Sequence, residues 1–122
     1  MTGTHEGNKV YFLRAIGMDG PVKIGCSNDP SVRLRLYNSL SPYPLEIVAV
    51  IDGSRDLEWN IHDCFFDQHS HHEWFSPSPR LNWLIKKLQN GVPIHEALDL
   101  SDRRGSVISK VASARAKKRR AA

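Results

Sequence analysis

Lys9-Val10-Tyr11-Phe12-Leu13-Arg14-Ala15 and Val22-Lys23-Ile24-Gly25 are the two stretches that decide how this 122-residue chain folds. Both are rich in apolar, β-branched and aromatic residues, which is typical of strands. Gly17–Pro21 between them has the composition of a turn. We therefore expect an antiparallel hairpin, with Tyr11 and Lys23 side by side on the paired strands.

A helix is predicted directly after the hairpin. Asn28 or Asp29 can cap its first turn, and Pro30 suits the first helical position. Apolar residues four apart predict that its buried stripe consists of Val32, Leu36 and Leu40. A different face of the same helix carries Arg33 and Tyr37, which are also four residues apart.

The rest of the chain predicts one more strand and further helices. We expect a strand over 45–51, a helix over 55–66 that Ser54 can cap, a helix from the Pro79 region to Gly91, and a short helix within 93–98. The helix over 55–66 has Leu57, Ile61 and Phe65 as its apolar stripe, with Glu58 and His62 four apart beside it. The predicted class is α+β, a three-stranded antiparallel sheet flanked by helices. One domain over 9–99 is expected, without internal repeats.

Charge is distributed unevenly along the chain, whose net charge is +4. Residues 1–100 contain 9 Lys or Arg and 12 Asp or Glu, for a net charge of −3. Residues 101–122 contain 8 Lys or Arg and one Asp, for a net charge of +7. A basic arm on a compact domain is typical of nucleic-acid binding, because each cation near a phosphate can release a counterion. The alternative is a weakly helical or disordered tail over 100–122 that only aids solubility. The predicted contacts are Arg103, Arg104, Lys110, Arg115, Lys117, Lys118, Arg119 and Arg120.

Composition excludes several classes of protein. No apolar run approaches the roughly 20 residues of a membrane helix, and the polar N-terminus shows no secretory signal. Cys26 and Cys64 do not make a disulfide framework, so we expect reduced thiols and a cytoplasmic protein.

The order of elements and the residues on them resemble the GIY-YIG nuclease superfamily. The first motif is represented by Lys9-Val10-Tyr11 and the second by Lys23-Ile24-Gly25. The arginine and second tyrosine of the following helix match Arg33 and Tyr37, and the metal-binding glutamate of the next helix matches Glu58. The resemblance covers roughly residues 9–88 and is greatest to a compact branch that also carries a Glu-Trp-Phe segment, here residues 73–75.

This resemblance implies a metal-dependent endonuclease that cleaves DNA. A Mg²⁺ or Mn²⁺ ion would be held by Glu58, because such ions keep several waters and need only one or two protein carboxylates. Tyr11 is the candidate general base, with Lys23 lowering its pKa from the neighbouring strand. Arg33 would bind a phosphate oxygen, for which Arg35 on another face is the natural control.

Each assignment has an alternative. Tyr37 can orient water or phosphate, or simply pack. His62 can relay a proton near neutral pH, or only orient Glu58 by a hydrogen bond. Packing, surface exposure and a plain ion pair are the alternatives for Tyr11, Arg33 and Glu58.

Two other hypotheses for the function of the whole chain stay open. One is a degenerate module of the same fold that binds DNA without cutting it. The other is a zinc-stabilised interaction protein built on a histidine-rich segment, although the paired spacing of a structural zinc site is missing. The residues of that second constellation are His62, Cys64, His69, His71 and His72.

Overall fold

The computed structural model describes residues 7–104. Its elements follow in the order β1 (Lys9–Ala15), β2 (Val22–Ser27), α1 (Pro30–Leu40), β3 (Leu45–Asp52), α2 (Arg55–Cys64), the short 3-10 helix η1 (Phe66–Gln68), β4 (His69–His71), β5 (Trp74–Phe75), α3 (Pro79–Gln89) and α4 (Ile94–Ala97). The first five elements match the expected boundaries to within two residues.

The sheet has five strands, in the order β3-β1-β2-β5-β4, so the expected three-stranded sheet is too small. The two additional strands, β4 and β5, contain only three and two residues, too few for any periodicity to show in the sequence. β5 pairs antiparallel with the start of β2, where Val22 and Lys23 face Phe75 and Trp74. This hairpin brings residues that follow α2 against the edge of β2.

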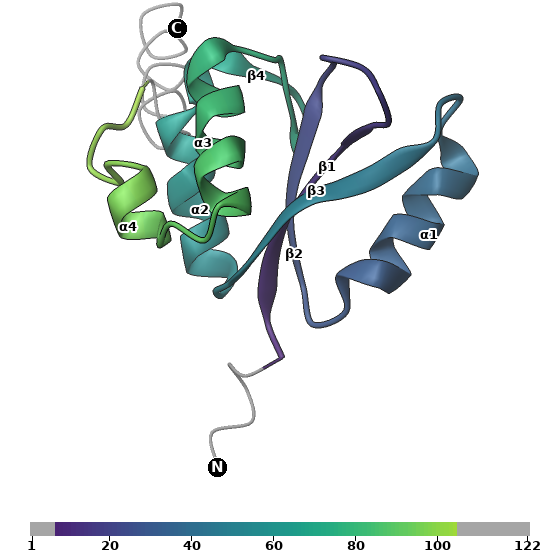
Figure 1. Ribbon diagram of the computed structural model, residues 1–122, viewed down its shortest axis with the longest axis horizontal. Helices are drawn as coiled ribbons and strands as arrows, with labels where there is room; N and C mark the ends of the chain where they lie inside the picture. The colour runs from purple at the N-terminus through teal and green to yellow at the C-terminus, as the bar shows by residue number, and fades with distance from the viewer. Residues whose placement is uncertain (1–6, 105–122) are drawn as a thin grey trace, which may run out of the picture.

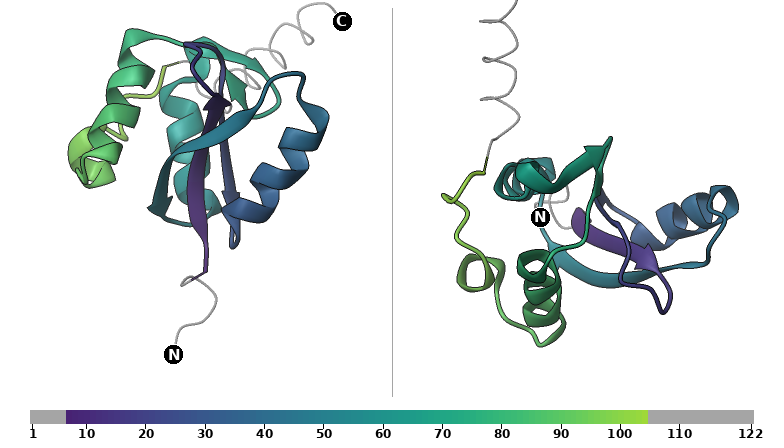
Figure 2. Two further views of the ribbon diagram at one scale, coloured as in Figure 1. Left: turned by 45° about the vertical axis from the view of Figure 1, so that its right-hand side comes forward. Right: turned by 90° about the horizontal axis from the view of Figure 1, so that it is seen from above.

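Helices cover both faces of the sheet. α1 lies on one face, and α2, α3 and α4 lie on the other (Figures 1 and 2). The main core forms beneath the three later helices and is filled by fully buried side chains, among them Val10, Phe12, Val22, Ile24, Ile61, Phe65, Leu81 and Leu84. Because side chains alternate along a strand, Tyr11 and Lys23 point toward the opposite face, the one that carries α1.

The packing of α1 differs from the expectation. Val32 and Leu36 are each 46% exposed and Leu40 is 74% exposed, so the predicted buried stripe is wrong. The partly buried residues of the helix are Pro30, Leu34 and Tyr37, which lie on another side. The four-residue spacing does place three apolar residues on one side of the helix, but that side is exposed. The side that carries Tyr37 is the one that packs toward the sheet. This orientation places Tyr37 beside Lys23.

Turn and cap residues fix where the helices begin and end. The Asp29 side chain accepts a hydrogen bond from the Val32 backbone N–H, and Pro30 occupies the first turn, as predicted. Ser54 precedes α2, but its side chain makes no capping hydrogen bond. Gly91 follows α3 with a φ of +82°, a conformation that favours glycine after a helix.

Candidate functional site

A cavity of about 730 Å³ opens between α2, the edge of β2 and the β4–β5 hairpin. It is lined by charged and aromatic side chains, which include Lys23, Tyr37, Arg55, Glu58, His62 and Glu73. Four of the residues predicted from the sequence therefore share one cavity, although they come from β2, α1 and α2. This clustering identifies the candidate functional site.

Glu58 supplies a buried carboxyl group to this cavity. It lies in the first turns of α2 and is only 3% exposed. Its Oε2 atom has no hydrogen-bond partner within residues 7–104. The nearest basic atom, His62 Nε2, is 3.5 Å away, and its own hydrogen bond goes elsewhere. An unsatisfied buried carboxylate oxygen is costly, so this atom is suited to a proton or a cation.

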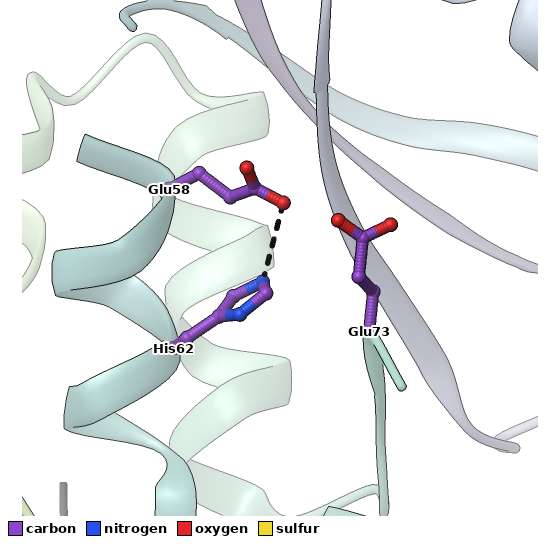
Figure 3. Close-up of side chains that lie close together, drawn as sticks. All are labelled: Glu58, His62 and Glu73. Carbon is purple, nitrogen blue, oxygen red and sulfur yellow. Dashed lines mark ion pairs between the residues drawn. The ribbon is translucent and has the colours of Figure 1, made fainter. Parts of the chain in front are cut away.

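Glu73 brings a second carboxyl group to Glu58. It precedes β5, and its side chain points toward Glu58 and His62 across the space between α2 and the sheet (Figure 3). One potential ligand atom from each of these three side chains lies within 4.8 Å of the others. Two carboxylates and an imidazole at this spacing are a donor set that can hold a divalent cation.

The two carboxyl groups differ in acidity. Burial, and then the hydrogen bond and charge of Glu73, raise the pKa of Glu58 to about 8. Burial alone would raise the pKa of Glu73 as well, but hydrogen bonds to Glu58 and Lys23 outweigh it and lower that pKa. Near neutral pH the pair therefore retains a proton on Glu58, while Glu73 is ionised.

Lys23 is the buried cation of the site. It is 4% exposed, and its Nζ donates to Glu73 Oε1 at 2.6 Å. The same ammonium lies 4.3 Å from the centre of the Tyr37 ring. The sequence predicted Lys23 at the site but not this partner. The ammonium group of Lys23 is therefore engaged in an ion pair with Glu73 and a cation–π contact with Tyr37.

Tyr11 lies beneath the site, with a side chain that is 2% exposed. Its pKa is raised well above the ordinary value, first by burial and then by the neighbouring Tyr37 and Glu73. The expected lowering of the Tyr11 pKa by Lys23 is wrong, because burial outweighs any such effect, and Lys23 pairs with Glu73. At neutral pH the Tyr11 hydroxyl is protonated and is a hydrogen-bond donor.

His62 connects α2 to the sheet. Its Nε2 lies 2.8 Å from the backbone oxygen of Ile24, and since a carbonyl only accepts, Nε2 carries a proton. Burial lowers the pKa of the imidazole, and Phe75 packs against the ring at 4.9 Å. Because the Nε2 proton is donated to Ile24, it is available neither for a proton relay nor for a hydrogen bond to Glu58, and His62 joins α2 to the sheet beside Glu58.

Arg33 and Arg35 both have exposed side chains on α1. Arg33 is close enough to Tyr11 to oppose the rise of its pKa, whereas Arg35 acts on Asp29 at the helix start. The two arginines thus have different neighbours. Arg33 is not among the residues that line the cavity, and its role at the site stays a prediction.

No role for Glu73 or Arg55 is predicted from the sequence. Glu73 belongs to the Glu-Trp-Phe segment, and its approach to Glu58 depends on the short β4–β5 hairpin. Arg55 lies three residues before Glu58 on α2, so helical spacing marks it as a neighbour of the site.

The histidine-rich segment does not assemble a zinc site among the described residues. Among residues 7–104, the potential metal ligands that come together are the side chains of Glu58, His62 and Glu73. His69 stacks on Phe66, and its Nε2 lies 2.5 Å from the backbone oxygen of His72. The Cys64 thiol instead faces the backbone oxygens of Asp99 and Leu100, each at 3.6 Å.

Two of the eight predicted DNA-contacting residues fall within the described part of the chain. Arg103 donates to Asp63 Oδ2 at 3.1 Å and to Asn60 Oδ1 at 2.9 Å, which attaches this segment to α2. Arg104 pairs with Asp102 at 3.1 Å. The other six, Lys110, Arg115, Lys117, Lys118, Arg119 and Arg120, lie outside the described residues.

Comparison with known proteins assigns the chain to a family. Residues 8–90 match the T5orf172 domain, and the chain belongs to that family. The domain is associated with nuclease and DNA-binding functions. No curated protein and no solved structure shows a significant match. No helix within residues 7–104 has the length and apolar character to cross a membrane.

Proposed function

We propose that this protein is a divalent-metal-dependent endonuclease that cleaves DNA, with its active site in the cavity beside Glu58. The observation that carries the proposal is the buried, unpartnered Oε2 of Glu58 next to a second carboxylate, Glu73. Membership of the T5orf172 family supports an action on DNA. The finer resemblance to GIY-YIG nucleases supports the cleavage chemistry and covers nearly the same residues.

Glu58 and Glu73 fit a Mg²⁺ or Mn²⁺ ion, because both supply carboxylate oxygens and such ions prefer oxygen ligands. When bound, the ion would polarise the phosphate and offset charge on the leaving oxygen. His62 would lie beside Glu58 from the adjacent turn of α2. Its Nε2 donates a hydrogen bond to the Ile24 carbonyl, so we assign no direct ligand bond to that atom.

The chain's other residues would act on the phosphate and the attacking water. Glu73, ionised near neutral pH, would supply the negative charge that attracts the ion. The protonated hydroxyl of Tyr11 would donate a hydrogen bond to a phosphate oxygen. Arg33 would supply a forked pair of donors from α1. Lys23 would keep Glu73 ionised and oriented through their hydrogen bond.

Nicking of supercoiled plasmid tests the proposal. The full-length protein should nick with Mg²⁺ or Mn²⁺ and stop when EDTA is added. Glu58→Gln should abolish nicking, whereas Glu46→Gln, at an exposed position of β3, should nick like the wild type. Full activity of Glu58→Gln would overturn the assignment of this cavity.

A second function, DNA binding without cleavage, is favoured by the contacts of Lys23. Its ammonium is buried against Glu73 and Tyr37 and is not turned to an incoming phosphate. In this case the protein would bind DNA, and no divalent metal would produce nicks. The same plasmid assay, with DNA binding measured beside it, distinguishes the two functions.

A further inference from the structure

Trp59 presents a large aromatic surface next to the carboxyl pair. It follows Glu58 directly on α2 and lines the same cavity, yet its side chain is 48% exposed. Glu58 and His62 on the same helix are almost completely buried. A solitary exposed tryptophan is ordinary on a protein surface, and Trp83 on α3, at 57% exposed, is such a case. Trp83 does not line the cavity, so the two exposed tryptophans differ in that only Trp59 lies beside the carboxyl pair.

Further aromatic rings share the cavity with Trp59. Trp74 comes from β5 and is partly buried, and Phe66 comes from η1, where His69 stacks on it at 5.1 Å between ring centres. The cavity volume, about 730 Å³, is within the range of sites that hold small organic ligands, roughly 300–1,000 Å³. A cavity of this size lined by aromatic rings is suited to a planar, aromatic group.

A cation lies on the same side of α2. Arg55 precedes Trp59 by four residues, which places the two side chains roughly 6 Å apart at the helix surface. Arg55 also lines the cavity, and its guanidinium takes part in none of the ion pairs formed within residues 7–104. An aromatic ring and a free guanidinium at this spacing match the base and the phosphate of one nucleotide.

We propose that this cavity binds an unpaired nucleotide, with its base stacked on Trp59 and its phosphate held by Arg55. The inference rests on the proposed function and adds the substrate class, which is single-stranded or locally opened DNA. Within a duplex, both faces of a base are covered by its neighbours, so only an unpaired or extruded base can stack on a protein ring. The carboxyl pair would then act on the backbone next to the bound base.

Binding of two strands with equal charge tests the inference. An oligothymidylate and an abasic phosphodiester strand of the same length differ only in their bases. Their affinities for the full-length protein are measured by competition in EDTA, where metal-dependent cleavage stops. The wild type should prefer oligothymidylate by about tenfold, the scale of one base–aromatic stack. Trp59→Ala should lose this preference, Trp59→Phe should keep part of it, and Trp83→Ala should keep all of it.

The outcomes separate this inference from the proposed function. If Trp59→Ala retains the preference, or Trp83→Ala loses as much of it, the inference is overturned, while metal-dependent nicking by the wild type still supports the nuclease. If only Trp59→Ala loses the preference but no metal produces nicks, the cavity is a nucleotide site and the cleavage proposal fails. Equal affinity of the wild type for both strands also overturns the inference.

Discussion

The ring of Tyr11 lies directly against Gly25 on the neighbouring strand. The two residues are paired across β1 and β2, and a Cβ atom at position 25 would come within 2.5 Å of both Cζ and the hydroxyl oxygen of Tyr11. No side chain larger than hydrogen fits there unless the ring moves. The glycine of the Lys-Ile-Gly motif therefore has a physical role, which is to leave room for the buried ring of Tyr11.

Gly25→Ala should accordingly displace Tyr11 and lower the free energy of unfolding by about 1–3 kcal/mol, the usual cost of overpacking. Gly20→Ala is the matched control, because a Cβ there meets nothing within 4 Å. Urea unfolding of the two variants measures the difference. Equal stability of both variants would show that the Tyr11 ring adjusts freely.

The raised pKa of Glu58 predicts how stability depends on pH. Its folded-state pKa of about 8 lies above the ordinary value of 4.5, so the folded state holds a proton that the unfolded state releases. The stability from this proton is complete below about pH 4.5 and is lost as pH rises through about 8. Glu58→Gln keeps the group neutral and should remove that loss.

In EDTA, the unfolding free energy of Glu58→Gln minus that of the wild type should therefore increase between pH 5 and pH 8. One pKa unit corresponds to about 1.4 kcal/mol, and Glu58 titrates across most of this window, so we expect a change of roughly 2–4 kcal/mol. Glu73 adds little here, because its lowered pKa leaves it ionised in both states above pH 5. Taking the difference removes the contribution of His62, whose lowered pKa gives the opposite trend. A difference independent of pH would contradict the shared proton.

Metal binding should stabilise the folded protein through the same two carboxylates. At pH 8, millimolar Mg²⁺ or Mn²⁺ should raise the melting temperature of the wild type, because an ion that binds only the folded state shifts the equilibrium toward it. Glu58→Gln and Glu73→Gln should each lose most of this increase, whereas Glu46→Gln should keep it. Thermal unfolding with and without EDTA is the measurement. A full shift in Glu73→Gln would show that Glu58 holds the ion without it.

Arg33→Ala should reduce cleavage far more than Arg35→Ala. Only Arg33 acts on the Tyr11 hydroxyl, and losing one charged donor to a transition state costs roughly 10²–10³-fold in rate. Both side chains are exposed on α1, so neither substitution should change stability by more than about 0.5 kcal/mol. Single-turnover nicking rates provide the comparison. Equal rate losses would mean that α1 contributes only general positive charge.

The sequence predicted those parts of the site that lie on long, regular elements. The hairpin that carries Tyr11 and Lys23 could be predicted because two short apolar strands leave few alternatives, but the expected side-by-side placement is wrong: Tyr11 is paired with Gly25 and Lys23 with Leu13. Glu58 and His62 could be placed together because they are four residues apart on a helix with a clear apolar stripe. These relationships are local or one turn away, so periodicity reports them directly.

Other parts of the site depend on packing that periodicity does not report. Glu73 meets Glu58 because a two-residue strand, β5, pairs with the edge of β2, and no sequence pattern marks so short a strand. The direction in which the pKa of Tyr11 shifts could not be predicted either, because it depends on burial and on the ion pair between Lys23 and Glu73. On α1, the side that carries Val32 is more apolar than the side that carries Tyr37. The Tyr37 side is nevertheless the one that is partly buried, and there the Tyr37 ring makes a cation–π contact with Lys23.

The basic tail should contribute affinity for DNA and not chemistry. Truncation after Arg104 removes six Lys or Arg and no Asp or Glu, which leaves a chain of net charge −2. DNA affinity should fall and its dependence on salt should flatten, because fewer counterions are released on binding. Cleavage at saturating DNA should survive, since Tyr11, Lys23, Arg33 and Glu58 all remain.

The position of the truncation matters because Arg103 belongs to the folded domain. Its hydrogen bonds to Asp63 and Asn60 join the end of the described chain to α2, and Asp63 is buried. Truncation after Leu100 would remove this arginine together with its hydrogen bonds to Asp63 and Asn60, at a cost of roughly 1–3 kcal/mol. We therefore expect the longer truncation, or Arg103→Ala in the full chain, to lower the melting temperature, and truncation after Arg104 to leave it unchanged. If truncation after Arg104 binds DNA as tightly as the full chain and with the same salt dependence, residues 105–122 are not a DNA-binding arm, and Arg33 and Arg55 beside the cavity become the cations to test next.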